Sequence, residues 1–340
     1  MAASMPCSIP QRSSVNILHE LRGLVASDLD QVNALIMEIG GSRVELILDM
    51  ADHIISSGGK RLRPILTLAS AQLCAYQGQR HIDLAAAVEF MHTATLLHDD
   101  VVDESLLRRG AETANNLWGN KASVLVGDFL LGQAFQLMVR SESLRVLEIL
   151  SRAAAVIAEG EVKQLVAKNS LETNFDLYLD IITSKTATLF AAACEISPVM
   201  ARRPKPEHQA LEQFGLNLGI AFQIADDALD YSAKQEELGK NIGDDFREGK
   251  VTLPVLYAYE RASSDEERAF WGRVIEEHQQ KPEDLQQAVT YIYNTGALEA
   301  TMERAKEYAE LGRRALGIFP DSPVKNTLLR LLDFVVDRPY

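Results

Sequence analysis

Two acidic segments, far apart in the chain, constrain the fold more than any other feature of the sequence. In the first, Asp99 and Asp103 lie four positions apart, and in the second, Asp226 and Asp230 have the same spacing. Side chains at i and i+4 share one face of an α-helix, where like charges destabilise the helix by about 0.2–0.5 kcal/mol. Apolar residues precede both segments, so we expect each acidic group at the solvated end of a buried helix.

A divalent cation would relieve the repulsion in both segments. Mg²⁺ is usually held by one or two carboxylates together with substrate phosphates, rather than by an all-protein cage. Two acidic helix ends that face each other would therefore form a clamp for magnesium and a diphosphate. A solvated acidic helix end is the alternative, and two copies with basic segments nearby argue against it. The candidate metal ligands are Asp99, Asp100, Asp103, Asp226, Asp227 and Asp230.

A basic segment, GGKRLRP, occupies residues 58–64. Its two glycines can end a helix or let the backbone approach a ligand closely. Pro64 suits the first turn of a following helix. Taken alone, the segment could be a basic helix-capping turn. Together with the acidic segments it predicts a phosphate-binding site at a helix N-terminus, where backbone amides and cationic side chains converge.

Apolar residues recur at helical spacing along nearly the whole chain. We find no convincing strand alternation and no repeat of 20–50 residues, and the prolines lie at helix joints. We therefore expect one all-α domain over residues 15–340, a bundle of ten or more helices, after a mobile tail over residues 1–14. Residues 197–206 are expected to form a loop. The helical patterns cover residues 15–50, 65–76, 84–98, 124–139, 144–166, 175–196, 211–231, 297–319 and 328–336.

Composition and charge exclude several classes of protein. The 340 residues are 47% hydrophobic, enough for a large core, and the net charge of −14 argues against a nucleic-acid-binding protein. Cys7, Cys74 and Cys194 are too widely spaced for a zinc site or a disulfide framework, which favours a reducing compartment. No apolar run is expected to reach the roughly 18 residues that span a bilayer, and no secretory signal precedes the domain. We therefore expect a cytoplasmic protein.

Five motifs together resemble the all-trans polyprenyl diphosphate synthase family. The resemblance extends from the glycine pair near residue 58 to the C-terminus, and it is specific because the motifs occur in one order at family spacing. It implies an all-α fold of the isoprenoid synthase type, a single large helical bundle with a central cavity. The motifs are GGKRLRP at 58–64, H-x₆-D-D-x-x-D with R-R-G at 92–110, S-K-T at 184–186, F-Q-x-x-D-D-x-x-D at 222–230, and G-K-N-I-G-D-D at 239–245 with Lys250.

This resemblance implies a Mg²⁺-dependent transferase that adds isopentenyl diphosphate units head to tail to an allylic diphosphate. Metal ions on the acidic segments would neutralise the pyrophosphate that leaves. In the family, that pyrophosphate is the expected base, so we assign no side chain to this role. Six residues are expected to take part in the chemistry: Asp99, Asp103, Asp226, Lys185, Thr186 and Gln223.

The resemblance also assigns the two substrates to separate sets of basic residues. Arginine can bind a phosphate through two parallel hydrogen bonds, whereas lysine contributes a point charge. The allylic diphosphate is expected against Arg108, Lys185, Lys240 and Lys250. Isopentenyl diphosphate, which needs no metal ion, is expected against Lys60, Arg63, His92 and Arg109.

The length of the product is expected to depend on the helix that ends at Asp99. Short-chain members of the family carry a bulky aromatic residue four or five positions earlier, where this chain has Thr95 and Ala94. The helix from Leu84 rises about 22 Å to the acidic segment, and only large residues such as Met91 could interrupt the chain along it. We expect a product of octaprenyl to decaprenyl length, typical of quinone side chains.

Other functions fit the residues less well. A class I terpene cyclase would lack the basic 58–64 segment and carry a different second metal motif. A non-catalytic subunit of a heteromeric prenyl synthase would not need both acidic motifs intact, and an acidic interaction module would need neither. A shorter, geranylgeranyl-type product is the alternative within the family. The resemblance implies a homodimer, and no membrane anchor is visible in the sequence.

Overall fold

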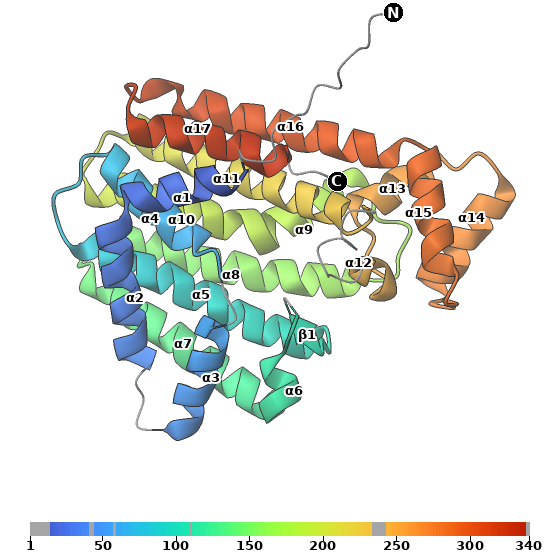
Figure 1. The fold of residues 1–340 in the computed structure, drawn as a ribbon, viewed down its shortest axis with the longest axis horizontal. Helices are drawn as coiled ribbons and strands as arrows, with labels where there is room; N and C mark the ends of the chain where they lie inside the picture. The colour runs from blue at the N-terminus through green and yellow to red at the C-terminus, as the bar shows by residue number, and fades with distance from the viewer. Residues whose placement is uncertain (1–13, 41–43, 57–58, 109, 233–242, 338–340) are drawn as a thin grey trace, which may run out of the picture.

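The computed structural model describes residues 14–40, 44–56, 59–108, 110–232 and 243–337 as a bundle of α-helices with one very short β-hairpin (Figure 1). The all-α prediction is confirmed. The elements up to the middle of the chain are α1 (Ser14–Leu24), α2 (Ala26–Gly40), α3 (Glu45–Ser56), α4 (Leu62–Leu73), α5 (Arg80–Val102), β1 (Leu107–Arg108), β2 (Ala111–Glu112), α6 (Ala114–Trp118), α7 (Asn120–Arg140) and α8 (Leu144–Ala167).

The second half of the chain adds further helices and three turns of other helical types. These elements are α9 (Phe175–Ile182), the π-helical turn η1 (Thr183–Ala187), α10 (Thr188–Met200), α11 (Lys205–Leu229), α12 (Asp244–Arg247), α13 (Leu253–Glu260), α14 (Asp265–Trp271), the π-helical turn η3 (Gly272–Glu276), α15 (Asp284–Asn294), α16 (Ala297–Ala315), the 3₁₀ turn η4 (Leu316–Ile318) and α17 (Pro323–Val336).

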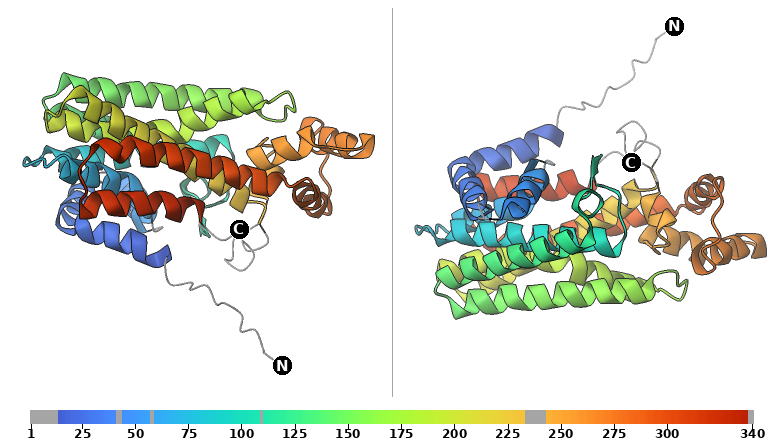
Figure 2. Two further views of the ribbon diagram at one scale, coloured as in Figure 1. Left: turned by 90° about the horizontal axis from the view of Figure 1, so that it is seen from above. Right: turned by 90° about the horizontal axis from the view of Figure 1, so that it is seen from below.

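Helices α5 and α10 lie at the centre of the bundle. α5 packs against α4, α7 and α10, and α10 also packs against α8 and α11. Every residue of α10 from Leu189 to Pro198 is buried. A helix that is apolar on nearly all sides belongs in a core, which explains the central position of α10, and its one charged residue, Glu195, is paired with Arg145. α11 lies between α10 and α16, and α17 packs against α1 and α16 (Figure 2).

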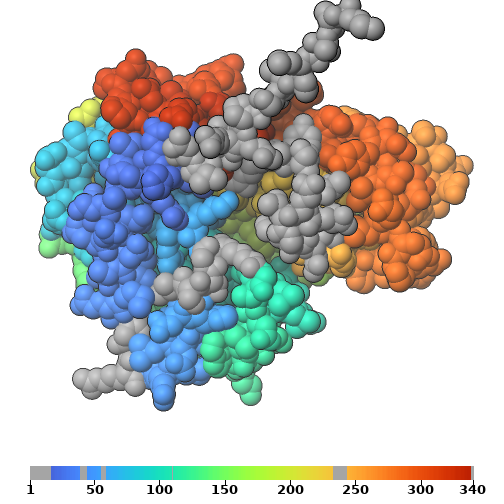
Figure 3. All heavy atoms as spheres, in the orientation of Figure 1, coloured from blue at the N-terminus to red at the C-terminus, as the bar shows by residue number. Residues whose placement is uncertain are grey.

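The C-terminal ends of α5 and α11 lie on the same side of the bundle, beside β1 and α12 (Figure 1). An ion pair supports this arrangement, because Asp103 at the C-terminal end of α5 contacts Lys250, which follows α12. Helices α13–α15 project beyond this region at one end of the molecule, opposite α1 and α2 (Figure 3). The fold thus places the two acidic segments on one side of the bundle.

Three local features differ from the sequence-based expectation. The helix expected over residues 175–196 contains the π-helical turn η1, and α10 continues through Pro198 into the loop expected at 197–206. Pro198 removes one backbone donor, a small loss near a helix end. Strands β1 and β2 pair antiparallel with Leu107 opposite Glu112. Two-residue strands are too short to show a period-2 pattern.

Helix α7 corrects another expectation, because its 21 residues are long and apolar enough to cross a membrane, with a mean hydropathy of 1.5 over 18 residues. Core helices of globular bundles pass the same test. About 39% of that window is buried, and α7 packs extensively against α5. The apolar composition of α7 therefore has an explanation within the bundle.

Two glycines allow the helices around η1 to pack closely. A Cβ atom on Gly219 of α11 would lie 2.6 Å from the Cα atom of Ala187. A Cβ atom on Gly160 of α8 would lie 2.7 Å from the Cβ atom of Ser184 and 2.9 Å from the backbone nitrogen of Lys185. Both contacts are closer than carbon atoms approach in folded proteins, so only glycine fits at these positions.

We expect Gly219→Ala to lower the free energy of unfolding by about 1–3 kcal/mol, because the added methyl group must push α11 away from the backbone of η1. Gly132→Ala in α7 is the matched control, since no atom lies within 4 Å of its added Cβ. The control should be neutral or slightly stabilising. Urea unfolding of both variants measures the difference, and equal stability of the two would contradict the packing argument.

Candidate active site

The first acidic group lies at the C-terminal end of α5, where the helix dipole is negative. Asp99 belongs to the last turn and Asp103 is the C-cap residue. Burial raises the pKa of Asp99, while the charges of Lys185 and Arg108 oppose the rise. The Lys185 Nζ atom lies 3.7 Å from Asp99 Oδ2, and the Lys250 Nζ atom lies 3.2 Å from Asp103 Oδ2. Two lysines therefore face the acidic end of α5.

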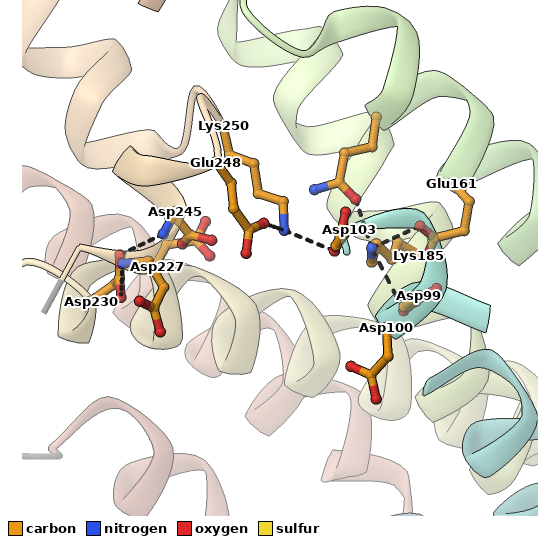
Figure 4. Close-up of polar contacts among 12 residues, drawn as sticks. Asp99, Asp100, Asp103, Glu161, Lys185, Asp227, Asp230, Asp245, Glu248 and Lys250 are labelled. Atoms are coloured by element: carbon orange, nitrogen blue, oxygen red, sulfur yellow. Dashed lines mark hydrogen bonds and ion pairs between the residues drawn. The ribbon is translucent and has the colours of Figure 1, made fainter. Parts of the chain in front are cut away.

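Asp100 does not join this group, because its side chain points away from Asp99 and Asp103 (Figure 4). The Arg108 Nε atom donates to Asp100 Oδ1 over 2.8 Å, and the Asp100 side chain is 6% exposed. Asn115 also donates to its backbone carbonyl over 3.1 Å. Asp100 thus anchors Arg108 and the β-hairpin to α5.

The second acidic group lies at the C-terminal end of α11, in its last turn and at its C-cap, as the first group does in α5. Asp226 is exposed, whereas Asp227 and the C-cap residue Asp230 are buried. Asp230 accepts the backbone N–H groups of Asp244 and Asp245 over 3.3 and 3.1 Å, at the start of α12. Burial and the neighbouring charge of Asp245 raise the pKa of Asp230 to about 8.

Lys250 lies between the two acidic groups (Figure 4). Its ammonium group contacts Asp103 and also Glu248, the latter over 2.5 Å. Burial disfavours its positive charge, but the carboxylates of Asp245, Asp103 and Glu248 raise the pKa of Lys250 above its usual value. The same lysine opposes the effect of burial on Asp245, whose pKa rises to about 6. Acidic and basic side chains therefore alternate across one opening.

The π-helical turn η1 presents Lys185 and Thr186 to this opening. The Lys185 Nζ atom donates to Glu161 Oε2 and to Gln164 Oε1, each over 2.7 Å, and both partners belong to α8. Burial raises the pKa of Glu161, and Lys185 opposes the rise. The motif S-K-T pointed to Lys185, but it gave no indication of Glu161 or Gln164, because these partners lie in a different helix.

Thr186, Gln223 and Asp227 form a hydrogen-bonded chain, in which Gln223 is the middle member. Thr186 Oγ1 donates to Gln223 Oε1, and Gln223 Nε2 donates to Asp227 Oδ1, each over 2.8 Å. Tyr178 in α9 donates its hydroxyl group to Asp227 Oδ2 over 2.7 Å. Asp227 therefore faces α9 and Gln223. The sequence reading missed Tyr178, which belongs to none of the matched motifs.

A cavity of about 130 Å³ lies between these helices, and Ile181 and Ile182 provide part of its apolar wall. Its lining residues come from α8, α9 and the segment that joins them, η1, α11 and residues 245–252, and none of them belongs to α5, so the path expected along α5 stays a prediction. The polar side chains that line it include Gln164, Lys168, Lys185, Thr186, Gln223, Asp227, Asp245 and Lys250.

The basic 58–64 segment lies at the start of α4. The Arg63 Nη1 atom lies 3.0 Å from His92 Nε2 of α5, and its guanidinium group lies 4.4 Å from the centre of the Phe190 ring. Arg61 has a positive φ of 52° at the N-cap of α4 and forms an ion pair with Glu89 of α5. Two contacts to α5 therefore fix the turn.

Arg109 and Lys240, two of the predicted substrate-binding residues, lie outside the described residues, as do most of the N-terminal tail and the first four positions of G-K-N-I-G-D-D. Lys60 is described and exposed, and its carbonyl oxygen accepts a hydrogen bond from Arg22 over 2.9 Å. Its neighbour Arg63 lies beside His92, as expected.

The three residues predicted to affect product length lie on α5 before Asp99. Met91 and Ala94 are buried, and Thr95 is half-buried with its hydroxyl group donating to the carbonyl oxygen of His92 over 2.8 Å. Their roles remain predictions.

Within the described ranges, no three acidic, histidine or cysteine side chains stand close enough to hold a metal ion by themselves. Magnesium does not require such a cage, since one or two carboxylates and substrate phosphates suffice. Asp99, Asp103 and Asp226 supply hard oxygen donors of the correct type at the ends of two helices. The donor set therefore fits a metal ion that is shared with a diphosphate.

Comparisons with known proteins agree with this geometry. The polyprenyl synthetase family model matches residues 44–292. Octaprenyl diphosphate synthase of Escherichia coli strain K12 is 45% identical over 94% of this chain and 99% of its own length. The all-trans-nonaprenyl-diphosphate synthase of Rhodobacter capsulatus is 40% identical over 96% of this chain and 99% of its own length.

Solved structures give the same result. A decaprenyl diphosphate synthase from Rhodobacter capsulatus has a TM-score of 0.91 and 51% identity, over 94% of this chain and 99% of its own. A polyprenyl synthase from Caulobacter crescentus, solved with calcium and isoprenyl diphosphate, has a TM-score of 0.92 and 49% identity, over 97% of this chain and 99% of its own. The family expected from the motifs is confirmed: the chain belongs to the polyprenyl synthetase family and is a long-chain all-trans polyprenyl diphosphate synthase.

Proposed function

We propose that this synthase condenses isopentenyl diphosphate with an allylic diphosphate, using Mg²⁺, and repeats the transfer until the product has octaprenyl to decaprenyl length. One observation carries the proposal: the acidic ends of α5 and α11 border one opening, with Lys185 and Lys250 between them. A diphosphate and metal ions fit this alternation of charges. A product of this length would supply the side chain of a quinone.

In this proposal Asp99, Asp103 and Asp226 hold the metal ions, since these carboxylates belong to the two helix ends at the opening. Magnesium, when bound, supplies positive charge that stabilises the leaving pyrophosphate. Asp100, Asp227 and Asp230 support these residues rather than replace them, because their oxygens already accept hydrogen bonds from the protein.

The basic residues bind and orient the two diphosphates. Lys185, Lys250, Arg108 and Lys240 would bind the allylic diphosphate, which requires that Lys185 and Lys250 turn from their carboxylate partners towards phosphate. On the α4 side, Lys60, Arg63, His92 and Arg109 would bind isopentenyl diphosphate. Thr186 and Gln223 line the cavity, where an allylic carbon would develop positive charge. Burial of the surrounding helices excludes water, which would otherwise consume that cation.

The growing chain would extend along α5, away from Asp99. Ala85, Ala86 and Ala87 are buried small residues on this helix, and Ala94 lies between them and the acidic group. Met91 is the large residue in this stretch that we expect to limit the product. Small side chains near the acidic end leave room for several isoprene units.

A second copy of the chain would cover apolar surface on α7 and α8, which pack against each other. Six apolar residues on or beside these helices have exposed fractions of 59–86%: Leu125, Val139, Leu144, Val162, Leu165 and Val166. Apolar surface of this extent is typical of interfaces. We therefore propose a homodimer through α7 and α8.

The proposed metal chemistry predicts that EDTA abolishes turnover with both substrates and that excess Mg²⁺ restores it. Asp99→Asn and Asp103→Asn should each lower kcat at least about a hundredfold, because each removes charge that acts on the leaving group. Release of pyrophosphate measures the rate. Asp321→Asn, at an acidic residue whose side chain is 90% exposed, is the control. Full activity of Asp99→Asn, or turnover in EDTA, would refute the proposed site.

Replacing Ala94 with Phe should shorten the product, because a ring at this buried position blocks the path along α5. Mass analysis of the polyprenyl products measures their length, and circular dichroism checks that the variant is folded. The first condensation should retain most of its rate. Unchanged product length in a folded variant would remove Ala94 from the path of the growing chain.

The homodimer predicts a mass of about twice 37.6 kDa for the purified protein in light scattering after size-exclusion chromatography. Leu125→Lys combined with Val166→Lys should give the monomer mass, because two charges would be buried in the interface. Leu311→Lys in α16 replaces a leucine that is 45% exposed outside α7 and α8, and it should leave the mass unchanged. A monomeric wild type would reject the interface.

A further inference from the structure

Four side chains from three helical elements form a continuous hydrogen-bonded chain along the wall of the cavity. It runs from Thr186 in η1 through Gln223 and Asp227 in α11 to Tyr178 in α9, with distances of 2.8, 2.8 and 2.7 Å. Thr186, Asp227 and Tyr178 are all buried. A buried chain of this kind is rigid when every member has its partner.

Asp227 gives this chain a direction. A glutamine amide has a donor end and an acceptor end, so its orientation depends on its neighbours. Tyr178 donates to one oxygen of Asp227, and Gln223 donates to the other. If the amide group of Gln223 were rotated by 180°, its oxygen would face an oxygen of the Asp227 carboxylate. The hydrogen bond between Gln223 and Asp227 would then be lost. The amide oxygen of Gln223 must therefore face Thr186.

The orientation of Gln223 in turn determines the orientation of the Thr186 hydroxyl group. Thr186 uses its hydroxyl proton to donate to Gln223, so the lone pairs of Oγ1 remain available on the other side. Thr186 lines the cavity. An oxygen that presents lone pairs to a developing positive charge stabilises it without any rearrangement during the reaction.

We infer that Tyr178 is a positioning residue of this enzyme: it anchors Asp227 and, through Gln223, holds Thr186 with its oxygen lone pairs towards the reacting allylic carbon. The inference rests on the roles proposed above for Thr186 and Gln223. It assigns to Tyr178 an effect on the rate of the chemical step rather than on the binding of either diphosphate.

The local structure suits Tyr178 for this task. The Asn174 side chain caps α9 by accepting the backbone N–H of Leu177 over 2.9 Å, and α9 continues directly into η1. Tyr178 and Thr186 therefore belong to one uninterrupted helical segment. Gln223 and Asp227, the two middle members of the chain, are four positions apart on one face of α11, so the middle of the chain also rests on one continuous helix.

A double-mutant cycle tests the inference. Tyr178→Phe removes only the hydroxyl group, and it should lower the single-turnover rate of the first condensation about 10- to 100-fold, while KM for each substrate changes less than about threefold. In the background of Thr186→Val, which lacks the hydroxyl group, Tyr178→Phe should have almost no further effect on the rate. Equal losses in both backgrounds would show that Tyr178 does not act through Thr186.

Controls separate this inference from the proposed function. Tyr291→Phe in α15 removes a tyrosine hydroxyl group within a remote aromatic cluster, and it should leave the rate unchanged. Full activity of Thr186→Val would refute the role of Thr186 and the inference with it. Loss of activity in Thr186→Val with a fully active Tyr178→Phe would refute the inference alone.

Circular dichroism checks that each variant is folded. Gln223→Leu replaces Tyr178→Phe in the cycle if the tyrosine variant is unfolded, because it breaks the same chain at its next member. A loss that disappears in the Thr186→Val background supports the inference, and an undiminished loss overturns it.

Discussion

Repulsion between carboxylates at the C-terminal ends of α5 and α11 is the constraint on which the rest of the site depends. Each helix end is already the negative pole of its dipole, and each carries three acidic residues within its last turn and C-cap. Lys185 and Lys250 offset this charge at the opening. The surrounding elements supply further donors: Arg108 in β1, the first amides of α12 and the hydroxyl group of Tyr178.

The two acidic segments follow the same plan. In each adjacent pair of aspartates, the first side chain is the more exposed, and the second is buried with its carboxylate bound by donors of the protein. Consecutive residues of an α-helix differ by about 100° in direction, so neighbours cannot both face one ligand. Asp100 holds the β-hairpin that carries Arg108, and Asp227 holds Gln223. The second aspartate of each pair thus orients a residue that can reach the substrate.

The sequence was a good guide to the helices and to the residues of the opening, because apolar periodicity and short motifs are local signals. It did not predict which way Asp100 and Asp227 face, since a motif records identity and spacing but not the partner of each side chain. Tyr178 and Asp227 are 49 positions apart, and Lys250 and Asp103 are 147 apart. Contacts of this range follow from packing, which no local pattern encodes. The same reason explains why Glu161 and Gln164 were missed as partners of Lys185.

The π-helical turn η1 has a consequence for sequence change in this region. A π-helical turn accommodates one more residue than an α-helical turn, so it shifts the phase of everything that follows by about 100°. Deleting one residue here could restore a regular helix from α9 into α10. The regular helix would rotate Phe190 away from Arg63. It would also remove the close packing of η1 against Gly160 and Gly219. Insertions and deletions should therefore be tolerated far less between residues 178 and 190 than substitutions that keep the register.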